Sequence, residues 1–124
     1  MSAHGGDRSN NPALAAQIET LRARGEGVFM PFVVIGDPDL TTSMKIALAL
    51  CDAGADIIEF GFPFSDPPAD GPVIQAADER ALAAGTTPAD CLAFIAELRA
   101  QRDTPVALLL YFNIIMQHGV RLFY

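Results

Sequence analysis

The sequence predicts an α/β fold built on a parallel sheet, and three observations support this prediction. Three short stretches are almost continuously apolar and rich in β-branched and aromatic residues, as is typical of strands covered on both faces. The segments between them place apolar residues at helical spacing. The order is helix, strand, helix, strand, two helices, strand, which indicates βαβ units. Periodicity alone does not decide between a barrel and an open sheet.

Composition narrows the class of protein. The chain has 124 residues, enough for one domain with a core, and 51% of them are hydrophobic. The net charge is −7 without a basic run, which argues against nucleic acid and anionic membranes as partners. No apolar stretch is long enough to cross a membrane, and two cysteines within helical patterns argue against a disulfide framework. We therefore expect a cytoplasmic protein, with residues 1–11 as a flexible polar leader.

The first half of the chain predicts two helices around one strand. Pro12 to Arg24 has apolar residues at spacings of four and three, which predicts a short amphipathic helix. Val28 to Ile35 predicts a strand, but Pro31 must then occupy a position whose N–H the ladder does not use, or a bulge. Turn residues follow the strand and lead into the second helix. The candidate caps of this helix are Thr41, Thr42 and Ser43.

The second half predicts two strands separated by two helices. Asp56 to Phe62 is the second predicted strand, and Pro72 to Ala84 is the helix after it. Thr87 is placed to cap the next helix, because a proline follows it and Asp90 lies in the first turn. Val106 to Tyr111 completes the series as the third strand.

A carboxylate interrupts the second predicted strand. Side chains alternate between the faces of a strand, so Glu59 shares a face with Gly61. The opposite face carries the bulky Ile58, Phe60 and Phe62, which suit a covering layer of helices. Glu59 also lies near the carboxyl end of its strand, where parallel α/β folds bind ligands, and this favours a general acid or base. A structural glutamate that pairs with an arginine or caps a loop is an equally weighted alternative.

The loop after this strand carries two more carboxylates, Asp66 and Asp70. Aspartate beside proline or glycine is common in turns, so each residue alone favours a structural role. Prolines at positions 63, 67, 68 and 72 lower the entropy cost of ordering the loop, which makes it a plausible part of a site. The two histidines lack metal-ligand spacing, and the sequence contains no glycine-rich phosphate loop.

The segment E-x-G-x-P-x-S-D-P-x-A-D-G-P, together with MPFVVIGDPD and LLLYFN, resembles the alpha subunit of tryptophan synthase. The resemblance covers Gly27 to Tyr124. It implies a (β/α)8 TIM barrel, in which residues 12–124 form the N-terminal part with the first three β/α units. It also implies a lyase of tryptophan biosynthesis that cleaves indole-3-glycerol phosphate to indole and glyceraldehyde 3-phosphate by a retro-aldol reaction.

The same resemblance implies roles for individual residues. Glu59 would be the general acid/base that helps protonate the indole ring at C3, and Asp70 would accept a hydrogen bond from the indole N–H. Three further residues match positions near the substrate, although each also suits ordinary barrel core: Tyr111, Phe32 and Leu109. The family needs no cofactor in this chain, because pyridoxal phosphate belongs to the beta subunit.

The loop that bears Pro63, Phe64 and Asp66 resembles the segment that meets this beta-subunit partner in an alpha2-beta2 heterotetramer. A barrel of this kind usually has about 250 residues, so we expect a truncated product, a fragment or a partial record of a longer protein. We expect this chain alone to be inactive, because the family's phosphate-binding loops follow later strands. The alternative is a non-catalytic piece that keeps only the interaction surface; another phosphate-handling barrel enzyme is a weaker third option.

Overall fold

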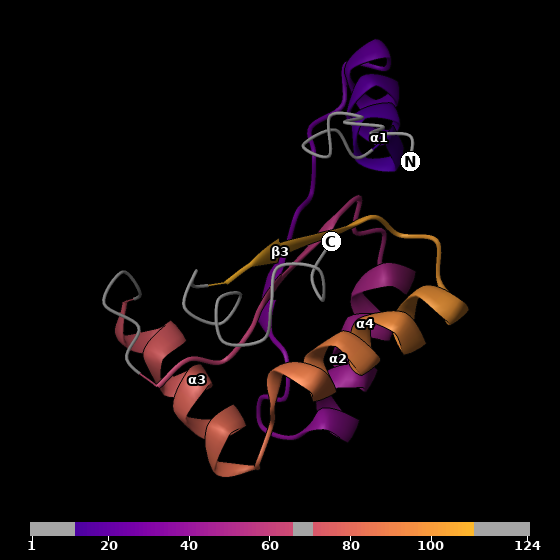
Figure 1. Cartoon of the computed structure of the whole chain (residues 1–124). Coiled ribbons are helices and arrows are strands. Elements are labelled where there is room, and N and C mark those ends of the chain that lie inside the picture. The colour runs from indigo at the N-terminus through magenta and orange to yellow at the C-terminus, as the bar shows by residue number, and fades with distance from the viewer. Residues whose placement is uncertain (1–11, 66–70, 111–124) are drawn as a thin grey trace, which may run out of the picture.

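The computed structural model of the chain describes residues 12–65 and 71–110, and it confirms a parallel sheet. The sheet has three strands in the order β1-β2-β3, with helices between them in sequence (Figure 1). The elements in chain order are α1 (Pro12–Ala23), β1 (Phe32–Val34), α2 (Leu40–Asp52), β2 (Ile58–Gly61), α3 (Pro72–Ala83), α4 (Pro88–Gln101) and β3 (Val106–Leu109).

All three strands are shorter than predicted, and β1 shows why. The chain approaches β1 in an extended form, and the Phe29 carbonyl accepts a hydrogen bond from the N–H of Asp56. Pro31 lies just before β1, where no N–H is required of it, and its carbonyl accepts from the N–H of Glu59 at 2.9 Å. Proline therefore contributes to the ladder as an acceptor only, and the regular strand begins one residue later.

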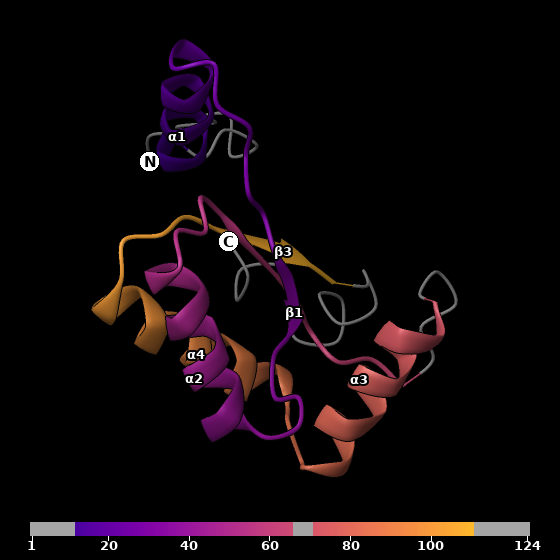
Figure 2. The same ribbon diagram turned by 180° about the vertical axis from the view of Figure 1, so that it is seen from behind.

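Helices α2 and α4 cover one face of the sheet and form the main core with it (Figures 1 and 2). Ile58, Phe60 and Phe62 of the second predicted strand all point into this layer and are buried, which confirms the predicted alternation. The ring of Phe60 meets that of Phe94 edge to face, with centroids 5.6 Å apart and planes at 81°. Aromatic pairs prefer this geometry, so it adds to the stability gained by burial.

In both helices the apolar residues at helical spacing form a stripe that packs into this core, as the periodicity predicts. In α2 the stripe comprises Met44, Ala47, Leu48 and Cys51. In α4 it comprises Cys91, Phe94, Ile95 and Leu98. Both cysteines are free thiols within these stripes, as expected. No single helix in the described ranges is long and apolar enough to cross a membrane; α3 and α4 reach that length only when counted together across a 98° bend.

The start of α2 differs from the prediction. None of the three predicted residues is the cap; Asp39 is. Its carboxylate accepts from the backbone N–H of Thr42 at 2.8 Å and from the Thr42 hydroxyl at 3.0 Å. These bonds lower the pKa of Asp39, because they favour the charged form. The hydroxyl of Ser43 instead accepts from the N–H of Gly36, which ties α2 to the end of β1.

The predicted start of α4 is confirmed. The Thr87 hydroxyl accepts from the N–H of Asp90 at 3.1 Å, and the Asp90 carboxylate accepts from the N–H of Thr87 at 3.0 Å. The two residues form a reciprocal capping box, with Pro88 at the first helical position.

Removing this cap tests its contribution. We expect Thr87→Ala to lower the free energy of unfolding by about 1 kcal/mol, because two backbone N–H donors lose their reciprocal arrangement. Thr41→Ala is the matched control, since Thr41 is exposed in the first turn of α2 and its hydroxyl has no bond to the described residues. The control should change stability by less than about 0.5 kcal/mol. Urea unfolding followed by circular dichroism measures both; equal effects would contradict the capping role.

The two thiols should differ in reactivity. Burial, together with the neighbouring Asp90 carboxylate, raises the pKa of the Cys91 thiol to about 12. We expect iodoacetamide at pH 8 to modify the half-buried Cys51 well before Cys91, and to modify both in urea; peptide mass spectrometry measures this. Equal labelling of the two thiols in the folded state would contradict the buried position of Cys91.

The raised pKa of Cys91 also makes stability depend on pH. Because the folded pKa of Cys91 exceeds its ordinary value of 9.0, the contribution of this thiol to the free energy of unfolding is complete below pH 9 and is lost as pH rises towards 12.

Candidate active site

The face of the sheet opposite α2 and α4 presents two rows of side chains set by the parallel register. The first row is Phe32, Glu59 and Ala107, one residue from each strand. The second row lies one step nearer the carboxyl ends and comprises Val34, Gly61 and Leu109. Ligands of parallel α/β folds bind at this end of the strands, so the two rows define the candidate site.

Glu59 lies at the centre of the first row and is half-buried. Its neighbours across the sheet are Phe32 on one side and the small Ala107 on the other. Among the described residues its carboxylate has no hydrogen bond or ion pair, and both arginine–aspartate pairs there involve other carboxylates. The alternative of a structural glutamate paired with arginine thus has no partner within the described part of the chain.

The aromatic ring of Phe32 lies against Gly61. A Cβ atom at Gly61 would stand only 2.7 Å from Cζ of Phe32, closer than real side chains allow. The space beside Glu59 that glycine provides is therefore filled by the edge of this ring. Phe32 reaches diagonally from β1 to β2, which aromatic side chains on adjacent strands are long enough to do. Any larger residue at position 61 would force the ring of Phe32 to move.

Helix α3 packs on the β1 side of the same face. Ala77 and Ala81 are buried against Val34, and Phe32 and Ile74 pack at the margin of this cluster. Small side chains on α3 let its backbone approach the strand closely. The helix begins immediately after residues 66–70, and its N-cap Gly71 makes no side-chain capping bond. The position of α3 therefore affects one wall of the site.

The turn after β1 is held in place from two directions. Arg80 of α3 donates from Nε to Oδ1 of Asp37 at 2.7 Å and from Nη2 to Oδ2 at 3.1 Å. This carboxylate raises the pKa of the Arg80 guanidinium. Thr86, beyond the end of α3, packs so closely on Gly36 that a Cβ atom there would collide with it. Gly36 also has a φ of 91°, which glycine adopts without strain.

The structure brings some of the predicted site residues together. Phe32, Glu59 and Leu109 share the face described above, and Leu109 is 51% exposed. Pro63 is buried and Phe64 is half-buried against the helix-side core. The other three predicted residues lie outside the described ranges: Asp66, Asp70 and Tyr111.

Residues that the sequence pattern did not identify also contribute to this region. Ala107 stands beside Glu59, and the Asp37–Arg80 pair joins the β1 turn to α3. Counting along the predicted strands would not have found Ala107, because starts at Asp56 and Val106 pair Glu59 with Leu109 instead. The ion pair joins residues 43 positions apart, and no local sequence signal indicates it.

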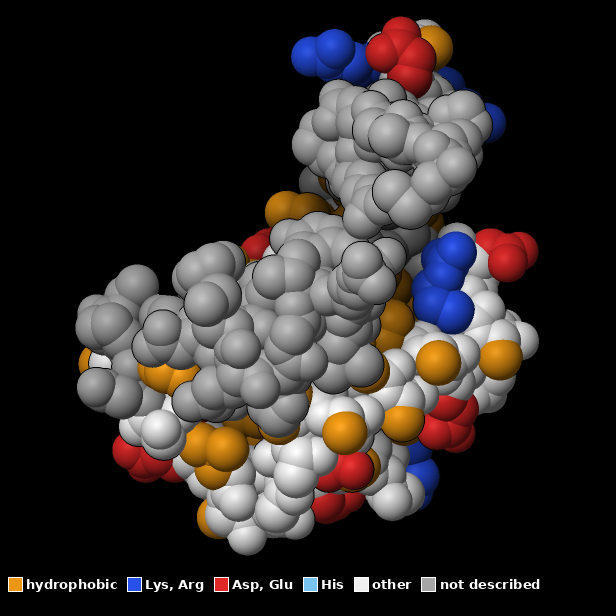
Figure 3. All heavy atoms as spheres, viewed as in Figure 1, with side chains coloured by type: hydrophobic (Ala, Val, Ile, Leu, Met, Phe, Trp, Pro, Cys, Tyr) orange, Lys and Arg blue, Asp and Glu red, His pale blue; other side chains and the backbone are white. Residues whose placement is uncertain are grey.

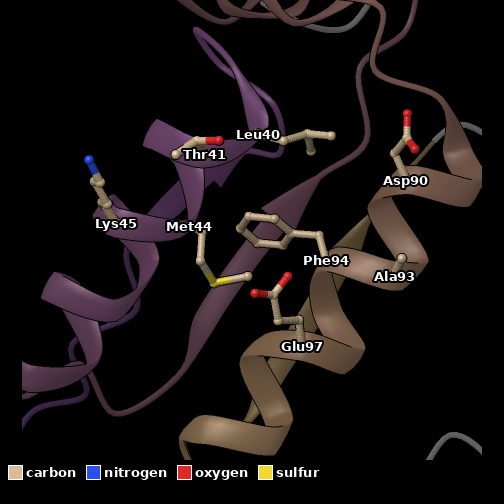
Figure 4. A pocket seen from close by; sticks show the side chains of 8 residues that line it. All are labelled: Leu40, Thr41, Met44, Lys45, Asp90, Ala93, Phe94 and Glu97. Carbon is tan, nitrogen blue, oxygen red and sulfur yellow. The ribbon is translucent and has the colours of Figure 1, made fainter.

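A separate cavity lies on the helix side of the sheet. It has a volume of about 430 Å³ and lies between α2 and α4, with Met44 and Phe94 facing each other across it (Figure 4). Its lining comprises Leu40, Thr41, Met44, Lys45, Asp90, Ala93, Phe94 and Glu97. Phe94 also packs on Phe60, which points away from Glu59, so the cavity is not part of the candidate active site.

Charge does not gather at one place on the visible surface. On the face shown in Figure 3, described acidic and basic side chains are interspersed, with apolar side chains between them. Within the ranges 12–65 and 71–110, no group of three histidine, cysteine, aspartate or glutamate residues is placed to hold a metal ion.

Comparisons of this chain with known proteins all indicate the same family. The sequence pattern of the family described as "Tryptophan synthase alpha chain" matches residues 18–124. The tryptophan synthase alpha chain of Shewanella oneidensis is 52% identical over 110 residues, which are 88% of this chain and 40% of that protein. This chain thus spans less than half the length of that relative.

Comparison with solved structures indicates the same family as the sequence comparison. Tryptophan synthase subunit alpha from Legionella pneumophila superposes with a TM-score of 0.87 at 36% identity, covering 92% of this chain and 44% of the other. A chain of tryptophan synthase from M. tuberculosis, in an aminoacrylate-bound form, superposes with a TM-score of 0.85 at 33% identity, covering 91% and 46%. The fold is therefore that of a partial β/α barrel, as predicted, with three parallel strands in the described residues.

The contact between Gly61 and Phe32 can be tested by substitution. We expect Gly61→Ala to destabilise the chain by about 1–3 kcal/mol, because the added methyl group overpacks the space beneath the ring. Phe32→Leu in the same chain should relieve much of this loss, since leucine leaves room for the methyl group. Urea unfolding of the two single variants and the double variant measures the coupling. Additive losses would show that the two residues do not share this space.

Proposed function

Because the chain belongs to the tryptophan synthase alpha chain family, we propose that it supplies the catalytic glutamate of an alpha-type lyase. The proposed reaction is the retro-aldol cleavage of indole-3-glycerol phosphate to indole and glyceraldehyde 3-phosphate in tryptophan biosynthesis. The chain spans 40% of its Shewanella relative, so we assign this activity to a barrel that includes the remaining strands. The observation that carries the proposal is the position of Glu59 on the face of β2 opposite α2 and α4, beside Phe32.

Glu59 would move protons between the two halves of the substrate. Protonation of the indole ring at C3 turns the ring into an electron sink, so the bond from C3 to the side chain can break. Loss of the proton from the side-chain hydroxyl then leaves an aldehyde, and one carboxyl group at the right distance can give the first proton and accept the second. A half-buried carboxylate without a competing bond to the described residues suits this exchange.

Asp70 is proposed as the partner of the indole N–H. A carboxylate beside the ring nitrogen stabilises the positive charge that develops when C3 is protonated. Phe32 and Leu109 would line the indole pocket together with Tyr111, and apolar walls suit a ligand of this kind. Support comes from the shared face of Phe32, Glu59 and Leu109, where the small Ala107 leaves space beside the carboxylate.

We further propose a beta-type subunit as the protein partner, in an alpha2-beta2 assembly in the cytoplasm. Pro63, Phe64 and Asp66 would contribute to its contact surface, and pyridoxal phosphate would belong to the partner rather than to this chain. The matched M. tuberculosis chain, which comes from a structure of tryptophan synthase, supports this proposal. The second candidate function is a non-catalytic chain that keeps only this contact surface.

Glu59→Gln tests the catalytic proposal. The experiment uses a completed barrel, in which this chain is followed by the C-terminal part of the Shewanella oneidensis relative. We expect Glu59→Gln to lower kcat for indole release by about 10²–10⁴-fold, with little change in substrate binding, because glutamine fills the same space but cannot exchange a proton.

Glu97→Gln is the matched control, since Glu97 is an exposed glutamate on α4, on the helix side of the sheet. It should leave kcat unchanged. Wild-type turnover in Glu59→Gln would remove Glu59 from the catalytic role. A completed wild-type barrel that releases no indole but binds a beta-type subunit would favour the second candidate function.

A further inference from the structure

Two arginine–aspartate pairs of nearly identical geometry hold opposite ends of the fold. Arg80 donates two hydrogen bonds to Asp37, of 2.7 and 3.1 Å, at the carboxyl end of β1. Arg102 donates two hydrogen bonds to Asp52, of 2.8 and 3.1 Å, where α4 and α2 end, near the amino ends of the strands. Both pairs use Nε and Nη2 against both carboxylate oxygens, which gives a planar and directional link. Only the first pair lies beside the candidate active site.

The ion pair between Arg80 and Asp37 supplements a weak hydrophobic contact between α3 and β1. The hydrophobic contact of α3 with the sheet consists of Ala77 and Ala81 against Val34, with Ile74 and Phe32 at its margin. Alanine side chains bury little area and interlock poorly, so this hydrophobic contact alone defines the orientation of α3 on β1 only weakly. Arg80 lies on α3 between these two alanines in sequence, and its fixed fork against Asp37 defines that orientation further.

The position of α3 on the sheet affects the residues that surround Glu59. Phe32 touches the α3 cluster, and its ring rests on Gly61, two residues beyond Glu59. Phe32 is also the register neighbour of Glu59 across the sheet. At its other end α3 starts at Pro72, two positions after Asp70 in the sequence. A shift of this helix would therefore move one wall of the candidate active site.

We propose that Asp37 and Arg80 are positioning residues of the active site, which hold α3 and Phe32 in the arrangement that Glu59 requires. This inference rests on the proposed lyase function. The pair lies at the edge of the sheet and is partly solvent-exposed, with 53% of the Arg80 side chain and 20% of the Asp37 side chain accessible, so we expect only a modest contribution to global stability. Its loss should affect turnover more than unfolding, whereas a merely structural ion pair would affect neither or would affect unfolding alone.

The first test is kinetic and uses the completed barrel. We expect Asp37→Asn and Arg80→Gln each to lower kcat about tenfold, the scale of a misplaced reacting group, and the double variant to lose no more than either single variant. Asp37→Glu keeps a carboxylate that can accept both bonds and should retain most activity. Arg80→Lys keeps the charge without the two parallel bonds and should behave like Arg80→Gln.

Asp52→Asn is the matched control, because it breaks a pair of the same type at the other end of the fold. It should leave kcat within about twofold, and it should change the unfolding midpoint no more than Asp37→Asn does, because Asp52 is 61% exposed and Asp37 only 20%. Equal loss of kcat in this control, or unchanged kcat in Asp37→Asn, would overturn the positioning role.

The second test does not depend on activity. In the 124-residue chain, amide hydrogen exchange within α3 should become several-fold faster in Asp37→Asn, while exchange within α4 stays unchanged. Asp52→Asn should not accelerate α3. A completed wild-type barrel without indole release would count against the proposed function, and unchanged exchange in α3 would count against the positioning pair, so the two failures are distinct.

Discussion

Strand β2 is bonded on both sides, and its register decides what each face of the sheet can do. The N–H of Glu59 donates to the carbonyl of Pro31, and the N–H of Ile58 donates to that of Pro105. Because side chains alternate, a slip by one residue would bring Glu59 into the helix-side core and expose Phe60 on the other face. Burying an unpaired carboxylate and exposing a large aromatic ring are both costly, so the hydrophobic core enforces the register. The position of Glu59 is thus a consequence of how Phe60 packs.

The two faces of the sheet differ in how firmly they are packed. On the helix side, large side chains interlock, and Phe60 and Phe94 meet in a favourable edge-to-face arrangement. On the other side, close approach depends on glycine and alanine: the ring of Phe32 lies on Gly61, and α3 approaches β1 through Ala77 and Ala81. Small residues allow proximity but provide little energy, so this side depends more on directional bonds. The Asp37–Arg80 pair provides such bonds beside the site.

The difference in packing between the two faces of the sheet explains where functional side chains can lie in this fold. A rigid helix-side core holds the strands, and the carboxyl ends of the strands carry turns whose conformation is decided by few contacts. Gly36 illustrates this, because its N–H bonds to Ser43 while Thr86 packs against its Cα. Loops supported in this way can present polar side chains at the ligand-binding end without disturbing the core.

Local sequence patterns were sufficient to predict the class of fold, the order of helices and strands, the buried stripes of α2 and α4, and the face on which Glu59 lies. These features follow from local periodicity and from capping residues such as Thr87, which act within a few positions of themselves. The three-dimensional structure was needed to show that Asp39 caps α2, that the ring of Phe32 fills the space at Gly61, and that Arg80 binds Asp37. Asp39 bonds to Thr42 only three positions away and is one of several adjacent polar residues, whereas the other two contacts join residues far apart in the chain. Distances of this kind are set by packing, which local sequence patterns do not encode.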